Sequence, residues 1–434
     1  MLRSLLVAPL RSMTVGVIQP LLSSFVSSLS LLSVALPPEL TFSRASVATD
    51  VIAGSLTSFS SNAPRISVEN GLLQESASTN LVKNSSCVAT VGTLTGGQAD
   101  PLGDTAAFLY TATATTTGQQ WSVGTATVAY VYNHVYTASA YVKAGTFDRV
   151  QMFLSATIVP SGTGYANFYL NGAGSVSASG ASVLNPGIEK LGATDWYRIW
   201  FSFTSNTTTN HTLAFCKLIT GSETRAPSVA GASQTMYFYG AQVEDAKNVS
   251  SLIPTTTTTV QRLVDSVTLP ITGYFNIAVF EACTPKTHNT AVSPILARFT
   301  SGNVLMEILK DGATSEIILK STNLGTTISL ASGVVVATGT VFRVAVSLAS
   351  GKYGISVDGH TQVATTGAKM DSESLTLGPS WGGYVRSVDL IHDPNGWEAL
   401  GLYSLNPTYL ATSSNLGEYL TNDDAGSFNY TWKD

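Results

Sequence analysis

Beyond Pro38 the chain consists of short runs in which apolar and polar residues alternate, separated by turn residues roughly every ten positions. Thr137 to Lys143, Trp196 to Phe203 and Met236 to Val243 are examples of such runs. Successive side chains of a strand point to opposite faces, so each run can bury one face and leave the other in solvent. Many short strands at this spacing predict an all-β chain built from β-sandwiches.

The length and a threonine run divide the chain into parts. With 434 residues it can hold about two to three domains of ~150 residues each, and the run Thr255 to Thr259 is typical of an extended linker. We therefore predict two tandem β-sandwich domains and a short N-terminal α-helix. The predicted parts are 1–38 (anchor or oligomerisation helix), 39–85 (lead-in segment packing on the first sandwich), 86–254 (first sandwich), 255–265 (linker), 266–405 (second sandwich) and 406–434 (C-terminal tail).

The composition indicates a surface with few charges. Charged residues make up 11% of the chain, against roughly 25% in an ordinary soluble domain. The outer strand faces must therefore be built from Ser, Thr, Asn and Gly, which suit permanent assemblies and neutral sugars. The net charge is −5, which argues against nucleic acid as a partner because no basic patch can pair with phosphates.

The N-terminal segment carries no charged residue from Ser12 to Pro38. Three interpretations of it are possible. Arg3 and Arg11 could begin a signal peptide, although serines dilute the apolar run. A membrane span would need about 20 predominantly apolar residues, and Pro20 interrupts them. The third reading is a helix that buries an apolar seam in a homo-oligomer, for which we predict a trimer. The seam residues follow one another at spacings of three and four: Leu22, Phe25, Leu29, Leu32 and Leu36.

No residue pattern typical of catalysis or metal binding is present in the sequence. The three cysteines are far apart, which makes a zinc site improbable. Glu244 and Asp245 are the nearest carboxylate pair, but neighbouring strand residues point to opposite faces and cannot flank a glycosidic bond together. We therefore predict that the chain is not an enzyme and needs no cofactor. Calcium is the one alternative, with Glu244 as a weak candidate ligand.

Several short motifs resemble those of a known family. Leu40 to Thr49, Pro64-Arg65, Gly71-Leu72 with Glu75, and Thr79 to Leu81 resemble the opening motif of head-spike and tail-fibre proteins of phages and gene-transfer agents. In that family the motif leads into a sandwich similar to carbohydrate-binding modules. The second half of the chain is similar to concanavalin A/laminin-G-type sandwiches. The matching segments there are 342–346, 357–359 and 384–390.

This resemblance implies jelly-roll, lectin-like domains in a virion surface appendage, on the head, neck or tail, that binds host cell-surface polysaccharide without cleaving it. The partners would be further copies of the chain, other virion proteins and host glycans. A purely structural capsid-decoration or collar fibre, and a secreted carbohydrate-binding protein, are the alternatives. Sugars stack on aromatic rings. We expect Trp196, Trp200 and Phe201 to lie in the core, and the candidate sugar-binding rings are Trp121, Tyr130, Tyr132, Trp381, Tyr384 and Trp397.

Overall fold

The structure is a computed structural model of the 434-residue chain. It describes residues 36, 40–67, 70–83, 87–114, 120–229, 233–271, 276–285, 293–302, 304–323, 326–349, 352–364, 374–391, 400–405 and 428–431. The chain divides into two units, 1–36 and 37–434, and all the strands described below belong to the second.

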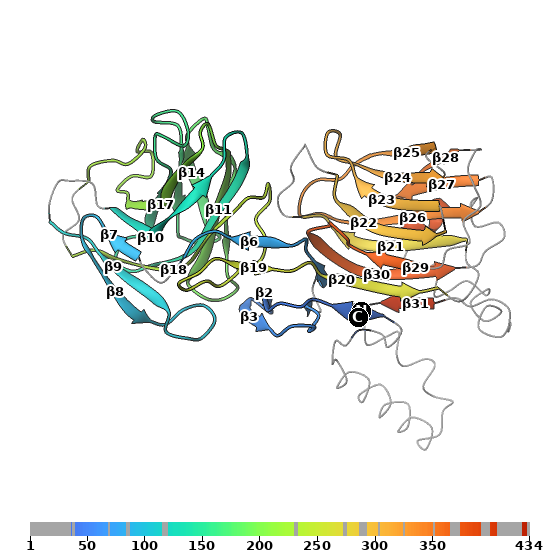
Figure 1. Ribbon diagram of the computed structural model, residues 1–434, viewed down its shortest axis with the longest axis horizontal. Helices are drawn as coiled ribbons and strands as arrows, with labels where there is room; N and C mark the ends of the chain where they lie inside the picture. The colour runs from blue at the N-terminus through green and yellow to red at the C-terminus, as the bar shows by residue number, and fades with distance from the viewer. Residues whose placement is uncertain are drawn as a thin grey trace, which may run out of the picture. The chain divides into compact units, whose positions relative to one another are not determined.

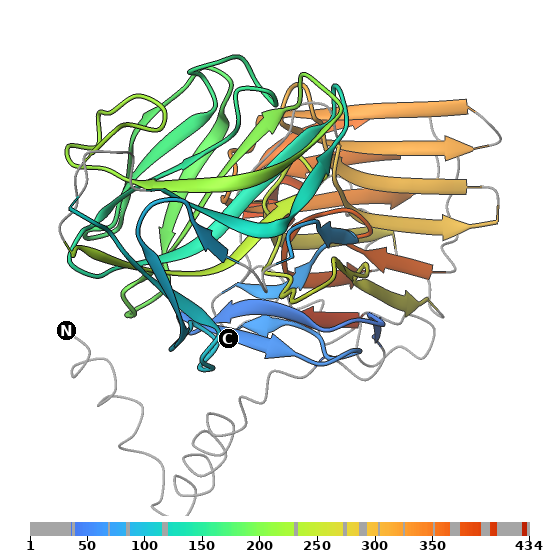
Figure 2. The same cartoon turned by 60° about the vertical axis from the view of Figure 1, so that its left-hand side comes forward.

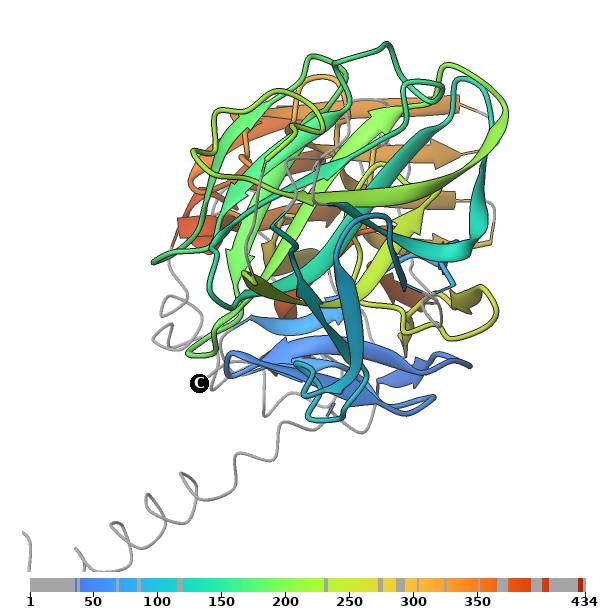
Figure 3. The same ribbon diagram turned by 90° about the vertical axis from the view of Figure 1, so that its left-hand side faces the viewer.

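Two six-stranded antiparallel sheets form the first sandwich, shown in Figure 1 and facing the viewer in Figure 3. One sheet runs, in spatial order, through β14 (Ser175–Ser179), β13 (Tyr165–Tyr169), β12 (Arg149–Phe153), β17 (Thr209–Lys217), β10 (Gln120–Tyr130) and β7 (Cys87–Ala89). The other runs through β15 (Leu184–Lys190), β16 (Trp196–Thr204), β11 (Val135–Ala144), β18 (Thr235–Glu244), β9 (Ala107–Thr111) and β8 (Thr93–Gln98).

Aromatic side chains from both sheets fill the core of this sandwich. Trp121 on β10 lies 5.7 Å from Phe215 on the neighbouring strand β17 and 6.4 Å from Phe238 on β18 of the opposite sheet, measured between ring centroids. Ile199 and Phe201 on β16 point into the same core. The alternate residues of β16 must therefore lie on the outer face of its sheet.

The second sandwich, coloured mainly yellow to red in Figure 2, is also antiparallel throughout. Its seven-stranded sheet runs through β1 (Thr41–Ser43), β20 (Ser266–Pro270), β29 (Ser374–Leu377), β22 (Ile295–Ser301), β23 (Val304–Lys310), β24 (Glu316–Asn323) and β25 (Thr326–Val335). The other sheet runs through β28 (His360–Ala364), β27 (Lys352–Val357), β26 (Val341–Ala349), β21 (Ile277–Cys283), β30 (Gly383–Ile391), β5 (Gly71–Gln74) and β4 (Ile66–Ser67), and β31 (Phe428–Thr431) also pairs with β30. Phe280 on β21 meets Phe299 on β22 between the two sheets, 6.1 Å apart. A short helix, α3 (Leu400–Leu405), packs Leu400 and Tyr403 against Ile277 and Val279 of β21.

The lead-in segment 39–85 does not pack on the first sandwich alone, so this part of the prediction was wrong. Its strands β1, β4 and β5 are hydrogen-bonded into the two sheets of the second sandwich. Its hairpin, formed by β2 (Ala48–Ile52) and β3 (Ser55–Phe59), packs Leu56 beside Tyr141 and Trp196 of the first sandwich. The remaining strand, β6 (Ser78–Asn80), pairs with β19 (Val260–Arg262) in the predicted linker. The segment therefore belongs to both sandwiches.

The predicted N-terminal helix and the predicted C-terminal tail can be compared with the structure only where residues are described. Of the predicted seam, Leu22, Phe25, Leu29 and Leu32 lie outside the described residues, and Leu36 is half-buried and outside any helix. In the predicted C-terminal tail, β31 extends a sheet of the second sandwich. Within the described ranges, no helix has the length and apolarity needed to cross a bilayer. The prediction of an all-β fold with two sandwiches is confirmed.

Candidate functional site

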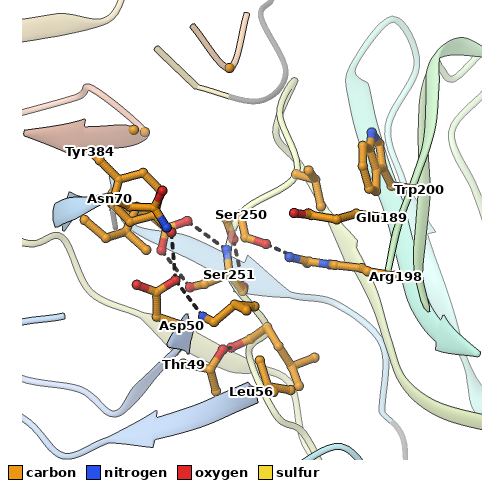
Figure 4. Close-up of a pocket in the computed structure, with 18 of the residues that line it drawn as sticks. Thr49, Asp50, Leu56, Asn70, Glu189, Arg198, Trp200, Ser250, Ser251 and Tyr384 are labelled. Atoms are coloured by element: carbon orange, nitrogen blue, oxygen red, sulfur yellow. Dashed lines mark hydrogen bonds between the residues drawn. The ribbon is translucent and has the colours of Figure 1, made fainter. Parts of the chain in front are cut away.

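A cavity of about 320 Å³ adjoins the outer face of the sheet that contains β15, β16 and β11. The hairpin β2–β3 and the segment 249–252 line it together with the start of β30. In Figure 4, Trp200, Glu189 and Arg198 lie on one side, Asp50, Asn70 and Tyr384 on the other, and Ser250 and Ser251 between them. We call the side with Trp200, Glu189 and Arg198 the first wall and the side with Asp50, Asn70 and Tyr384 the second wall. The segment 249–252, with the two serines, is the floor between them.

The strand register creates the first wall. Ile199 and Phe201 fill the core of the sandwich, so Arg198 and Trp200 project from the opposite face of β16. On β15, Glu189 pairs with Arg198 and Gly187 pairs with Trp200. This alternation places an indole ring, a guanidinium and a carboxylate side by side on one surface.

Trp200 can take its position because its neighbour on β15 is a glycine. A Cβ built on Gly187 would lie 2.2 Å from Cζ2 of the indole, far inside van der Waals contact. The ring therefore lies directly over the backbone of Gly187. The indole is half-buried and lines the cavity.

Hydrogen bonds hold the floor of the cavity against the first wall. Nη2 of Arg198 donates to the carbonyl oxygen of Ser250 at 2.6 Å and to Oγ of Ser139 at 3.2 Å. The guanidinium also lies over the ring of Tyr141, 5.5 Å from its centroid. On the other side, Oγ1 of Thr49 donates to the carbonyl oxygen of Leu252 at 2.8 Å. The segment 249–252 is thus fixed to both the sheet and the hairpin.

Asp50 and Tyr384 form the second wall. The hydroxyl of Tyr384 donates to Oδ1 of Asp50 at 2.9 Å, and the backbone N–H of Val51 donates to the same oxygen at 2.7 Å. Oδ2 is itself buried and accepts no hydrogen bond from the residues that the structure describes. Burial raises the pKa of Asp50 to about 6, although the charge of Arg65 and the bond from Tyr384 act in the opposite direction. Burial and the nearby charge of Asp50 raise the pKa of Tyr384.

A buried ionic network lies behind the second wall and is built mostly from the motif residues of the lead-in segment. Arg44 pairs with Asp265 at 3.0 Å, and Arg65 bridges Asp265 and Glu75. Nε of Arg262 lies 3.6 Å from Glu75. Side chains from the lead-in segment and from the predicted linker therefore pair three arginines with two carboxylates out of contact with water, which gives the motif a structural role.

Glu75 connects this network to the floor of the cavity. Its Oε1 accepts a hydrogen bond from the backbone N–H of Ser251 at 2.7 Å, and its Oε2 accepts one from the Ser251 hydroxyl at 2.6 Å. Burial alone would raise the pKa of Glu75, but the charges of Arg262 and Arg65 together with the bonds from Ser251 lower it to about 2. Glu75 is therefore ionised at any ordinary pH and holds the floor in place.

Three of the six predicted sugar-binding rings are buried in the protein, so the prediction was wrong for them. Trp121 is 0% exposed and stacks on Tyr110 with 4.3 Å between ring centroids. Tyr130 is 1% exposed and packs edge-on against Tyr136. Trp381, also 1% exposed, donates its indole N–H to the carbonyl oxygen of Cys283. None of these rings presents a face to a ligand.

The other candidates have different outcomes. Tyr132 is 65% exposed in the turn between β10 and β11 and does not line the cavity. Tyr384 lines it, and Trp397 lies outside the described residues.

Glu244, the candidate calcium ligand, is fully buried and accepts hydrogen bonds from the side chains of Ser78, Gln242 and Ser250. In the part of the chain that the structure describes, no three His, Cys, Asp or Glu side chains gather closely enough to hold a metal ion.

Trp200, Arg198 and Asp50 were not identified from the sequence as candidate site residues, although all three line the cavity. We expected Trp200 in the core beside Phe201, but the two rings point to opposite faces of β16. Aromatic residues at consecutive positions of a strand cannot all face one core, and this was the signal in the sequence. The position of Asp50 depends on how the hairpin packs, which no local pattern reveals.

Comparisons with known proteins found similarities among solved structures only. No family model matches the chain, and no curated protein matches its sequence. Solved structures with some similarity include mouse laminin alpha1 chain domains LG4-5, at 12% identity over 70% of this chain and 90% of that one, with a TM-score of 0.23. The LG1-3 region of the laminin alpha2 chain has 12% identity over 62% and 64%, with a TM-score of 0.23. A tail fiber protein from a phage of E. coli has 10% identity over 73% and 40%, with a TM-score of 0.19. At TM-scores this low, the three likenesses carry no argument about the site.

Proposed function

We propose that this chain is a non-catalytic glycan-binding protein of a virion surface, with the cavity beside Trp200 as its sugar site. One observation carries the proposal: the cavity places an indole ring opposite a wall of carboxylate, phenol and amide groups. Sugars present an apolar ring face together with an edge of hydroxyl groups, and sites that bind them combine an aromatic platform with a few polar side chains.

The location on a virion rests on the motif resemblance of the lead-in segment, together with the low charge of the chain. An appendage on the head, neck or tail would present several copies of the site at once. Weak binding at a single cavity then becomes strong attachment to a polysaccharide-coated cell, because later contacts form at a high effective concentration. Other virion proteins and further copies of the chain are the partners that this role implies.

Binding to sugars tests the proposal directly. Full-length protein is applied to an array of bacterial capsule and lipopolysaccharide glycans, alongside Trp200→Ala and Tyr132→Ala. We expect Trp200→Ala to weaken binding by about tenfold or more, because it removes the stacking platform. Tyr132→Ala is the matched control, since that ring is exposed but outside the cavity. Equal loss in both variants, or no glycan bound by the unaltered protein, would overturn the proposal.

The absence of catalysis is part of the same proposal. We expect no steady release of reducing ends when the purified protein is incubated with a polysaccharide that it binds. Continuous release that depends on Asp50 or Glu189 would instead make the cavity an active site.

A purely structural capsid-decoration protein is the second candidate. It is favoured by the burial of Trp121, Tyr130 and Trp381, which leaves fewer aromatic platforms than the sequence suggested. Binding of the protein to virus particles with no binding to any glycan would support this candidate over the first.

A further inference from the structure

We propose that the cavity recognises a sugar by two adjacent hydroxyl groups: one donates a hydrogen bond to the carboxylate of Glu189, and its neighbour accepts one from Nη1 of Arg198. The inference deepens the proposed glycan-binding function and rests on it, because it takes the Trp200 indole as the platform on which the sugar ring stacks. It makes sugars with a free vicinal diol the ligand class of the site, and it assigns their selection to the first wall.

The strand register places the two charged groups side by side. Glu189 on β15 is the direct partner of Arg198 on β16, and opposite residues of an antiparallel pair have Cβ atoms about 4.5–5.5 Å apart. Both side chains leave the outer face of the sheet, since Ile199 and Phe201 on β16 fill the core. A negative and a positive group thus project from neighbouring positions beside the same cavity.

The indole of Trp200 lies one step further along the same face. Trp200 follows Arg198 by two residues, a rise of roughly 6.6 Å along a strand. In Figure 4 the indole, the guanidinium and the carboxylate of Glu189 lie on one side of the cavity. A pyranose ring that stacks on the indole therefore brings hydroxyls of its edge beside the charged pair.

The guanidinium of Arg198 is held in a fixed orientation that leaves one nitrogen for a ligand. Nη2 donates to the carbonyl oxygen of Ser250 and to Oγ of Ser139, and the group lies over the ring of Tyr141. Nε is buried, so a ligand does not reach it. Nη1, in contrast, is not one of the buried polar atoms that lack a partner, and the described residues accept no hydrogen bond from it. Nη1 is therefore open to solvent, and its donors have a defined direction before any ligand binds.

The carboxylate of Glu189 can be reached from the cavity. Glu189 is exposed, lies on the edge strand β15 and lines the cavity. A carboxylate has two oxygens with about four lone-pair sites, so it accepts a ligand hydroxyl in addition to any other bond. Burial raises the pKa of Tyr141, and the charges of Arg198 and Glu189 shift it in opposite directions. Both charges therefore act at the same place, where Tyr141 also lines the cavity.

One charged acceptor beside one charged donor favours a pair of hydroxyls over an acidic group. A hydroxyl donates as well as accepts, so two neighbouring hydroxyls satisfy the carboxylate and the guanidinium together, and hydrogen bonds to charged groups are the stronger ones. The carboxylate of a uronic acid would satisfy Arg198, but it would also place a like charge beside Glu189. A glycan that is linked or substituted at either hydroxyl loses one of the two bonds. The first wall therefore discriminates against sugars whose diol is blocked.

The test uses the full chain and the methyl glycosides of glucose, galactose, mannose and N-acetylglucosamine as probes, with affinities measured by ligand-observed NMR at pH 7.5. Deoxy analogues of the glycoside that binds best, one for each hydroxyl, are then compared with the parent sugar. We expect two analogues, deoxygenated at adjacent carbons, to bind about tenfold more weakly, because each loses one hydrogen bond to a charged group. The methyl glycoside of the corresponding uronic acid should bind no more tightly than the neutral sugar.

Two variants assign each hydroxyl to its residue. In Glu189→Ala one of the two analogues should bind as well as the parent sugar, and in Arg198→Lys the other analogue should do so. Only the ratio between parent and deoxy sugar is read, so a displaced floor, which weakens every sugar alike, does not imitate this result. Tyr132→Ala is the control and should leave both ratios unchanged, since its ring is exposed outside the cavity. Glu189 is exposed on an edge strand, so its variant decides the question if Arg198→Lys does not fold.

The outcomes separate this inference from the proposed function. Trp200-dependent binding without a pair of sensitive adjacent hydroxyls would contradict the inference and leave the proposed function standing. Deoxy losses that persist in full in Glu189→Ala, or a uronic acid that binds more tightly than the neutral sugar, would do the same. If neither these glycosides nor the array glycans bind to the unaltered protein, both proposals are overturned.

Discussion

Replacing Asp50 with asparagine should stabilise the unliganded protein at neutral pH. The carboxyl is buried, and burial disfavours its charged form more than Arg65 and the hydrogen bonds from Tyr384 and Val51 favour it. Asparagine keeps an oxygen for both donors and carries no charge. The variant therefore resembles the protonated state of the native residue.

The pKa of Asp50 gives the size and sign of this effect. Its ordinary value is 3.8 and its value in the fold is about 6, so the two differ by roughly two pH units. At 1.36 kcal/mol per pH unit this corresponds to about 3 kcal/mol. Because the folded state binds the proton more tightly than the unfolded state, the contribution of Asp50 to the unfolding free energy falls as pH rises from about 4 to about 6. Above that window the penalty is constant, and below it the penalty vanishes.

Urea unfolding at 25 °C, from pH 4 to pH 8, measures this difference between Asp50→Asn and the unaltered protein. The variant should gain up to about 3 kcal/mol at pH 7.5 and almost nothing at pH 4. Asp389→Asn is a parallel measurement elsewhere in the fold, since burial also raises the pKa of Asp389 to about 6 although Arg343 opposes it. A difference for Asp50→Asn that does not change with pH, or a variant that is less stable at pH 7.5, would refute the reasoning. A carboxylate that lowers the stability of the fold and lines a cavity is typical of a functional group. The unfolding experiment therefore gives evidence about the site without any ligand.

Three further changes test other parts of the structure. Glu75→Gln should lower the unfolding free energy at pH 7 by about 3–5 kcal/mol, because it leaves buried guanidiniums without their partner, and the difference should shrink as pH falls from about 4.5 toward 2. Urea titrations at several pH values would show this. Gly187→Ala should displace the Trp200 indole and reduce glycan binding on the array as strongly as Trp200→Ala does, since the new Cβ would lie 2.2 Å from Cζ2 of the ring; unchanged binding would place the sugar elsewhere. Leu29→Asp should dissociate a full-length oligomer in light scattering if the N-terminal seam assembles the protein, and an unaffected oligomer would contradict that prediction.

The fold class could be predicted because it depends on local patterns. Alternation in runs such as Thr137 to Lys143 identifies strands, and turn residues between them identify sandwiches. The partner of each strand could not be predicted in the same way. Strand β5 pairs with β30, which is far along the chain, and β1 pairs with β20. An apolar strand such as β5 is compatible with either sandwich, so only the complete packing decides which one it joins.

The site was harder to predict because a residue belongs to it only if its side chain points toward the cavity, and the residue type alone does not reveal that direction. Trp121 and Trp200 are the same residue type in similar strands, yet one ring lies in the core and the other lines the cavity. For Trp200 the alternation with Ile199 and Phe201 contained the answer, since the core can take only one of the two faces of β16. For Asp50 no such pattern exists, because its burial depends on a hairpin that packs against both sandwiches.

The motif residues and the cavity are parts of one structure, and this explains how a structural motif can support the proposed site. Arg65 and Arg262 neutralise Glu75, and Glu75 uses both oxygens to hold Ser251 in the floor of the cavity. The charge of Arg65 also opposes the effect of burial on Asp50, which keeps the pKa of that carboxyl near 6 rather than higher. The network therefore fixes both the position of the floor and the charge of the second wall. The outer face of the first sandwich supplies the other wall. Arg198 on that face is hydrogen-bonded to the floor at Ser250, but Trp200 belongs to a different part of the cavity from the ionic network, so its side chain can change without disturbing the network that holds the lead-in segment.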